Sequence, residues 1–188
     1  SPRKPSRLLL RDSITKVFDL ELSRVRMGKT SDGLIKAVVT SKEIGNSLVS
    51  SFGTFRTMKF SNGLLPPAKL PVALLLGSGY TKEFLRVAFS CDGGVSLYVA
   101  YRKGAQGGTK WLIRTVFLAC THPALRSDYV TLITSLGIRV REVSADGKIK
   151  IETERDIRLF AKHIGFVPDV RATGDSKFWK GERKNAIL

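Results

Sequence analysis

Hydrophobic and polar positions in the second half of the chain follow a pattern that predicts an ordered series of helices and strands. An apolar helical segment that includes Leu85 and Phe89 ends at Asp92, and the glycine pair Gly93–Gly94 stops it. Beyond the glycines, partial alternation predicts strands, and apolar residues at helical spacing predict helices. The predicted elements are strands at 95–103 and 110–119, a helix at 124–135, strands at 138–143 and 148–153, and a helix that ends near residue 165.

The last helix of this series has the clearest boundary signal. Thr153, followed three residues later by Asp156, is typical of a capped helix start. The residues expected to form its buried stripe are Ile157, Phe160, Ala161 and Ile164. The second half is therefore predicted to contain a helix, two strands, a helix, two strands and a helix, in that order.

The first half follows the beginning of this order in a shorter form. Strands are predicted at 20–27, 34–40 and 54–60, with a helix at 41–52 that Gly53 ends. Residues 37–53 and 117–137 share a strand, a small polar hinge and a helix ending in glycine, which indicates an internal repeat. We therefore expect an N-terminal repeat at residues 8–65, a proline-rich linker at 66–80, a C-terminal repeat at 81–171 and a basic tail at 172–188.

Asp92 lies where a helix is expected to pass directly into a strand. A carboxylate held at such a junction is well placed to bind a divalent metal ion. If the two halves are repeats, the first half should contain a matching acid, and the segment 14–23 provides Glu21 at the equivalent position. Asp19, two residues earlier, is the alternative ligand if the register of the repeat differs.

The charge balance narrows the class of partner. The 188 residues contain 32 Lys and Arg against 16 Asp and Glu, giving a net charge of +16 and a pI near 10.3. So large an excess favours nucleic acid as the partner. No apolar run reaches the roughly 18 residues of a membrane span. Two cysteines provide neither a disulfide framework nor a zinc site. We expect a cytoplasmic protein with no membrane partner.

The segments around the two acids resemble the paired motifs of a known family. Leu85-Arg-Val-Ala-Phe-Ser-Cys-Asp-Gly-Gly94 and Ile14-Thr-Lys-Val-Phe-Asp-Leu-Glu-Leu-Ser23 are similar to the motifs of the LAGLIDADG homing endonucleases, in the double-motif, archaeal intron-encoded form. In that family an apolar helix ends in an acid that is followed by glycine. The resemblance extends over residues 8–170.

The resemblance implies an α+β fold of two pseudo-symmetric αββαββα repeats, each with a curved antiparallel sheet that binds the DNA major groove. It implies that Glu21 and Asp92 bind Mg²⁺ (or Mn²⁺) over the scissile phosphates, with the backbone carbonyls of Leu20 and Cys91 completing the site. It also implies catalytic cations beside the metal, for which Lys69 and Arg171 occupy similar positions after the two repeats.

Side chains that point away from the helices are expected to contact DNA. Strand alternation assigns most of them, and the family resemblance implies Lys42 and Lys103 as further cations near the predicted metal site. The predicted DNA-binding residues are Arg24, Arg26, Lys36, Lys42, Tyr98, Arg102, Lys103, Arg114, Arg139, Arg141, Lys148 and Lys150. The two histidines, His122 and His163, are interpreted as structural or DNA-facing, and Cys91 and Cys120 as small core-packing residues.

The sequence therefore predicts a monomeric, Mg²⁺-dependent endonuclease that cuts double-stranded DNA at a long asymmetric site. Lys16, Leu22 and Val87 stand where the family has small residues. These differences keep open a second interpretation, a non-cleaving protein of the same fold that binds intron RNA or DNA. A third interpretation is a basic ribosome-associated or structural RNA-binding protein, in which both acids are incidental.

Overall fold

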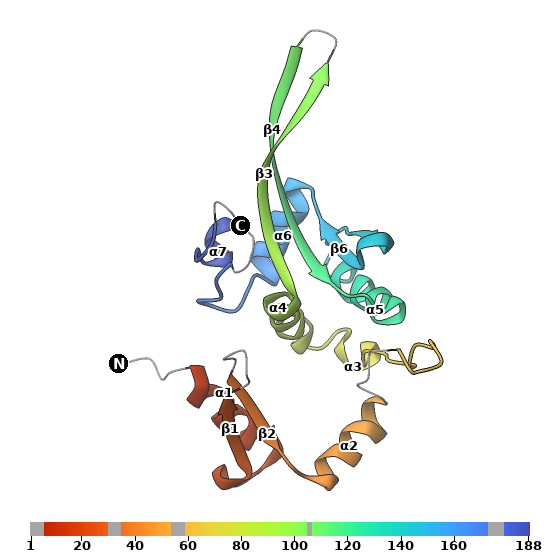
Figure 1. Cartoon of the computed structure of the whole chain (residues 1–188), viewed down its shortest axis with the longest axis vertical. Helices are drawn as coiled ribbons and strands as arrows, with labels where there is room; N and C mark the ends of the chain where they lie inside the picture. The colour runs from red at the N-terminus through yellow and green to blue at the C-terminus, as the bar shows by residue number, and fades with distance from the viewer. Residues whose placement is uncertain (1–5, 30–34, 54–58, 105–106, 173–178) are drawn as a thin grey trace. The chain divides into compact units, whose positions relative to one another are not determined.

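The helices and strands of the chain fall into two units, Ser1–Gly53 and Thr54–Leu188. A computed structural model describes residues 6–29, 35–53, 59–104, 107–172 and 179–188 (Figure 1). Both units mix helices with antiparallel strands, which confirms the predicted α+β class. None of the helices within the described ranges has the length and apolarity needed to cross a membrane.

The first unit contains two helices and one pair of strands. The helices are α1 (Ser6–Phe18) and α2 (Lys42–Phe52), and the strands are β1 (Val25–Lys29) and β2 (Ile35–Val39). The strands pair antiparallel, from Val25 opposite Val39 to Lys29 opposite Ile35. The Ser41 hydroxyl accepts a hydrogen bond from the amide of Ile44 and so caps the start of α2.

The first strand of this unit begins later than predicted. After α1 ends, Asp19 adopts a positive φ of 48°, and a single 3₁₀ turn at Leu22–Arg24 precedes β1. Residues 20–24 therefore form the turn between α1 and β1 and are not part of the strand. Of the strand predicted at 54–60, residues 54–58 lie outside the described residues, and Lys59 and Phe60 are not in a strand.

The second unit contains the predicted series of elements. It consists of α3 (Val72–Leu75), α4 (Tyr80–Asp92), β3 (Gly93–Gly104), β4 (Gly107–Ala119), α5 (Pro123–Thr134), β5 (Arg141–Val143), a 3₁₀ turn (Ser144–Asp146), β6 (Lys148–Ile151), α6 (Glu154–His163) and α7 (Lys184–Ile187). From α4 to α6 the order is helix, two strands, helix, two strands, helix, as expected from the sequence. The relation of the two units as repeats stays a prediction.

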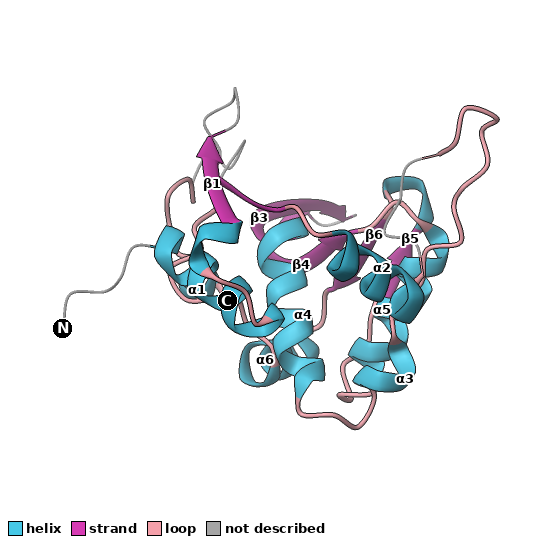
Figure 2. Ribbon diagram, turned by 90° about the horizontal axis from the view of Figure 1, so that it is seen from below, coloured by secondary structure: helices cyan, strands magenta, loops and turns pink. Residues whose placement is uncertain are grey.

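The four strands form one antiparallel sheet in the order β3-β4-β6-β5. Helices α4, α5 and α6 lie on one side of it (Figure 2). We call that side the inner face, because Val116, Leu118, Ile149 and Ile151 on it are buried with Leu85, Phe89 and Phe160 of the helices. Only residues 116–119 of β4 pair with β6, so the β3–β4 hairpin extends well beyond the rest of the sheet (Figure 1).

Helix α6 is capped as predicted. The Thr153 hydroxyl accepts from the amide of Asp156 at 3.2 Å, and Ile157, Phe160 and Ile164 are buried. Ala161 is exposed, contrary to the prediction, because it faces the open side of the helix. Asp156 is fully buried, and its carboxylate accepts hydrogen bonds from Thr153 Oγ1 and from the backbone amide and Nε of Arg139.

The segments predicted as a linker and a tail both pack on the second unit. Pro66 and Ala68 are buried, and the Pro66 carbonyl is 2.8 Å from Nε2 of the buried His122, whose Nδ1 caps α5. The amide of Leu70 donates to Asp128 at 2.8 Å. At the other end of the chain, Asn185 exchanges two hydrogen bonds with the backbone of Phe166. The structure therefore gives His122 a structural role.

Asp156 makes the stability of this unit depend on pH. Burial raises the pKa of its carboxyl, but hydrogen bonds from Thr153 and Arg139 outweigh burial and hold the pKa below its usual value. A depressed pKa contributes stability that is fully present above about pH 4 and is lost as the pH falls through the folded-state pKa.

We expect Asp156→Asn to lower the free energy of unfolding by about 2 kcal/mol at neutral pH, because charged hydrogen bonds are lost. Urea titrations between neutral pH and acid should show that the variant loses less stability on acidification than the wild type. Asp146→Asn, at an exposed acid of the 3₁₀ turn before β6, is the matched control. Parallel pH profiles for Asp156→Asn and the wild type would contradict this assignment.

Candidate functional site

Asp92 is the last residue of α4, and its side chain is exposed. This confirms the predicted position of the acid at a junction between a helix and a strand. The amide of Gly93 closes the helix by donating to the carbonyl of Phe89. The glycine pair forms no separate turn, however, because Gly93 and Gly94 are already the first residues of β3 and pair with Leu118 and Phe117.

The two glycines are required by close backbone packing. A Cβ atom at Gly93 would lie 2.6 Å from the carbonyl oxygen of Phe89 and 2.7 Å from that of Phe117. A Cβ at Gly94 would lie 2.8 Å from the Phe117 ring. The end of α4 therefore rests directly on β4, and this contact fixes where the backbone of Asp92 lies relative to the sheet.

Lys184 of α7 clamps the same junction from the C-terminal end of the chain. Its ammonium group is largely buried and donates to the carbonyls of Ser90 at 3.1 Å and Gly93 at 2.7 Å. A cation at the C-terminus of a helix also interacts favourably with the helix dipole. Burial lowers the pKa of Lys184, an effect that the charges of Cys91 and Asp92 partly oppose.

Burial raises the pKa of two further groups near Asp92, Cys120 and Tyr129. Burial raises the pKa of Cys120, although a hydrogen bond to His122 and the charge of Arg126 oppose this, and Asp92 adds to the rise. Burial, together with the charges of Cys120, Asp92 and Cys91, raises the pKa of Tyr129 to about 12. Cys91 is exposed, so the prediction that it packs in the core was wrong; it lies on the open side of α4.

The predicted partner acid lies in the first unit and differs from Asp92 in its local structure. Helix α1 ends at Phe18, and Glu21 is the exposed residue that precedes the 3₁₀ turn, with Oε2 accepting from the Ser23 hydroxyl at 3.2 Å. The repeat predicted Glu21 at the end of a helix, and the structure shows that it is not there. Asp19 follows α1 much more closely. Which acid joins Asp92, and the roles of the Leu20 and Cys91 carbonyls, stay predictions.

A metal ion bound at Asp92 would have few protein side chains as ligands. Within the ranges that the structure describes, no group of three or more His, Cys, Asp or Glu side chains is suitably clustered for a metal ion. Mg²⁺ is commonly held by one or two carboxylates together with water and substrate phosphates, so an exposed carboxylate such as Asp92 fits that donor set.

Lys69 and Arg171, the predicted catalytic cations, are both exposed. Lys69 lies between buried Ala68 and partly buried Leu70, in the segment that packs on α5. The guanidinium of Arg171 donates to the carbonyl of Gly181 at 2.5 Å, and its backbone pairs with that of Arg183. Arg171 therefore helps to hold the C-terminal segment in place, and the catalytic roles of both cations stay predictions.

The sheet surface opposite the helices, which we call the outer face, carries aromatic and basic side chains. Strand register places Tyr98 opposite Ile113, Ala100 opposite Trp111, Phe117 opposite Lys150, and Lys150 opposite Arg141. The Lys148 ammonium lies 5.4 Å from the centre of the Phe117 ring. Trp111 was missed by the sequence analysis, although its even spacing from Phe117 along β4 places both on one face.

The structure separates the predicted DNA-binding residues of the second unit into distinct groups. Tyr98, Arg141, Lys148 and Lys150 lie on the outer face, as their predicted parity required. Arg139 donates to buried Asp156 and so supports the cap of α6. Arg102 and Lys103 belong to β3, but their side chains lie outside the described residues.

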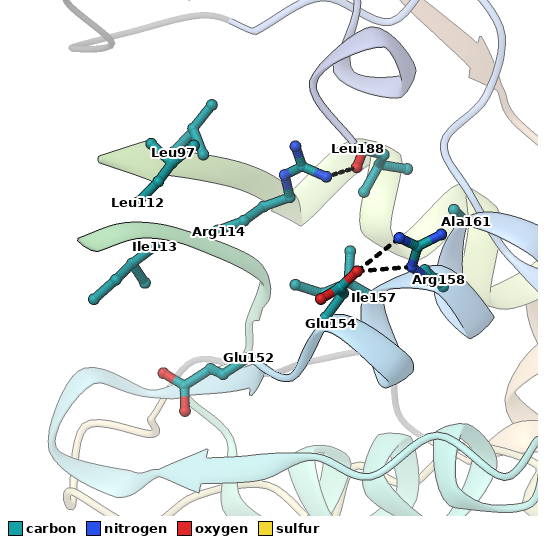
Figure 3. Close-up of a pocket in the computed structure, with 10 residues that line it drawn as sticks. All are labelled: Leu97, Leu112, Ile113, Arg114, Glu152, Glu154, Ile157, Arg158, Ala161 and Leu188. Atoms are coloured by element: carbon teal, nitrogen blue, oxygen red, sulfur yellow. Dashed lines mark hydrogen bonds and ion pairs between the residues drawn. The ribbon is translucent and has the colours of Figure 1, made fainter. Parts of the chain in front are cut away.

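Arg114 was predicted on the DNA-binding face of its strand, and this prediction was wrong because its side chain lies on the other face. It lies on the same side of β4 as buried Val116 and Leu118, and it donates a hydrogen bond to the Leu188 carbonyl. Figure 3 shows it at the edge of a pocket of about 580 Å³ between the hairpin and α6. The Glu154–Arg158 ion pair lines the same pocket. Arg114 therefore belongs to the inner side of the sheet.

The predicted DNA-binding residues of the first unit are all exposed. Arg26 and Lys36 share one face of the strand pair, because Arg26 lies opposite Val38 and Gly28 lies opposite Lys36. Arg24 is in the 3₁₀ turn before β1, and Lys42 is the first residue of α2.

Acidic residues partly neutralise the outer face. Arg141 forms two hydrogen bonds of 2.7 Å with Glu152, which raises the pKa of Arg141 and lowers that of Glu152. Lys150 lies 3.5 Å from Asp146. A phosphate offers the same charge-assisted hydrogen bonds as a carboxylate, so it can take the place of the carboxylate as the partner of each cation.

Comparison of the chain with known protein-family models and with curated proteins finds no match.

The clamp at Lys184 predicts a loss of stability in Lys184→Met, which keeps most of the apolar side chain but removes its donors. Two partly buried carbonyls would lose their partner, so we expect the free energy of unfolding to fall by about 1–3 kcal/mol. Hydrogen exchange should accelerate at the start of β3. Lys180→Met, at an exposed position, is the control. Equal stability of the two variants would contradict a clamp.

Close packing at the junction predicts that Gly93→Ala destabilises the protein by about 1–3 kcal/mol, because the new methyl group meets backbone atoms that cannot move independently. Chemical denaturation measures the change. Gly79→Ala is the matched control, since a Cβ at Gly79 meets nothing within 4 Å. If both alanines are tolerated equally, α4 does not rest on β4 as described.

Proposed function

We propose that this protein binds double-stranded DNA on the outer face of the second unit and hydrolyses its phosphodiester bonds with Mg²⁺ bound at Asp92. The observation that carries the proposal is the position of this acid. Asp92 is exposed at the end of α4, directly before β3, and the outer face of the sheet that contains β3 carries Arg141, Lys148 and Lys150.

The charge of the chain supports a polyanionic partner. A net charge of +16 attracts phosphates over long distances and makes binding strongly dependent on salt. The apolar side chains of β4 and β6 that face the helices are buried, whereas Tyr98, Trp111 and Arg141 on the outer face are exposed and can contact a ligand.

Each residue of the junction has a part in the proposed reaction. Asp92 supplies a hard oxygen ligand, and Lys184 and the glycine pair hold that ligand in place. The family resemblance adds Glu21 or Asp19 as a second carboxylate ligand, and Lys69 and Arg171 as the cations proposed to neutralise the reacting phosphate. Bound Mg²⁺ supplies charge neutralisation and an activated water.

A non-cleaving nucleic-acid-binding protein is the second candidate, with intron RNA as its ligand. The structure of the first motif favours it, because α1 ends at Phe18 and Glu21 lies beyond the helix in a separate turn. A poorly placed second ligand would weaken metal binding without affecting the basic surface. Under either function we propose that the chain acts as a monomer.

Cleavage can be tested without knowing the target, by incubating the protein and Mg²⁺ with a duplex library of random sequence and recovering cut ends. We expect selected duplexes to be cut on both strands. Asp92→Asn should reduce cleavage by about 100-fold or more while leaving DNA binding intact, as is typical when a group that stabilises the transition state is removed. Glu83→Gln, at an exposed acid of the same helix, should cleave normally.

Two results would count against the proposal. Normal cleavage by Asp92→Asn would exclude Asp92 as the metal ligand even though the protein is a nuclease. Absence of Mg²⁺-dependent cleavage, combined with tight binding of intron RNA, would favour the non-cleaving function.

A further inference from the structure

We propose that the extended part of the β3–β4 hairpin binds unpaired bases of single-stranded DNA, with Tyr98 and Trp111 as stacking positions. This inference rests on the proposed DNA-binding function and adds a second class of substrate structure to it. The relevant ligand is a DNA duplex that continues into a single-stranded segment.

The two aromatic side chains are neighbours on the outer face. Trp111 lies opposite Ala100, and Tyr98 lies opposite Ile113, so the two rings occupy diagonal positions of one antiparallel ladder. Diagonal neighbours in such a ladder are separated by about 7–8 Å, within reach of aromatic side chains. Ala100 and Ile113, which lie opposite them in the ladder, are apolar and share the same face.

Both rings are open to solvent, with exposed fractions of 51% for Tyr98 and 57% for Trp111. The cause is the extension of the hairpin beyond the sheet, since β6 pairs only with residues 116–119 of β4. Folding of the sheet therefore does not require large aromatic residues at these positions. Exposed apolar surface of this kind is typical of interaction sites.

Cations lie closer to the base of the hairpin on the same face. Lys148 lies over Phe117, and Lys150 and Arg141 follow across β6 and β5. Aromatic side chains beside a positively charged groove are the combination with which proteins bind single-stranded nucleic acid, through stacking of bases and contacts to the phosphates.

A duplex alone would not use this surface fully. Paired bases present only their edges in the grooves, and the faces with which an aromatic ring stacks are covered by neighbouring base pairs. An unpaired segment offers those faces. We therefore assign the cations at the base of the hairpin to the duplex and the aromatic residues to the single strand that leaves it.

The test compares a blunt DNA duplex with the same duplex carrying a short single-stranded DNA overhang, in the full-length protein. A Trp179→Phe background leaves Trp111 as the remaining tryptophan of the two in the sequence. We expect the overhang to tighten binding by about 5- to 100-fold, as measured by fluorescence anisotropy, and to quench the fluorescence of Trp111.

Substitutions separate stacking from general binding. In the otherwise unaltered chain, Trp111→Ala should remove the gain from the overhang while leaving the affinity for the blunt duplex unchanged. Trp111→Phe should retain part of the gain, because it restores an aromatic ring. Leu112→Ala is the control, since Leu112 is also more than half exposed but lies on the opposite side of β4.

The outcomes distinguish this inference from the proposed function. Tight binding of the blunt duplex with neither added affinity nor quenching from the overhang would overturn the stacking assignment alone. Failure of every DNA to bind would overturn the proposed function as well. A preference of more than about tenfold for an RNA overhang of the same sequence would overturn the assignment to DNA.

Discussion

The contact between the end of α4 and strand β4 is the constraint on which the rest of the second unit depends. Gly93 lies between the carbonyls of Phe89 and Phe117 with no room for a side chain, and Lys184 donates to carbonyls on both sides of the junction. Because the helix ends against the sheet, its last residue projects from a fixed point. Packing at the junction therefore fixes the position of the Asp92 backbone, from which the exposed carboxylate projects.

One face of the sheet forms the core, and the other face is available to bind a ligand. Burial of Val116, Leu118, Ile149 and Ile151 against three helices stabilises the sheet, and alternation sends the neighbouring residues to the outer face. Substitutions there can change affinity with little effect on the core. Ion pairs such as Arg141–Glu152 keep the outer cations oriented until a phosphate takes the place of the carboxylate.

Local signals were predictable from the sequence, and distant contacts were not. The Thr153 cap and the order from α4 to α6 depend on short-range patterns. The position of Arg114 depends on which parity of β4 meets the helices, and the sequence alternates too weakly there to decide it. Glu21 was misplaced because a positive φ at Asp19 ends the helical path early. Lys184 was missed because its partners are about 90 residues away in the chain.

The most direct measurement of the central claim is paramagnetic line broadening by Mn²⁺ in NMR spectra of the isotope-labelled protein bound to DNA. A metal held at Asp92 should broaden the amide signals of residues 91–94 first. Broadening confined to other acidic residues, or spread evenly over the surface, would contradict a metal site at the end of α4.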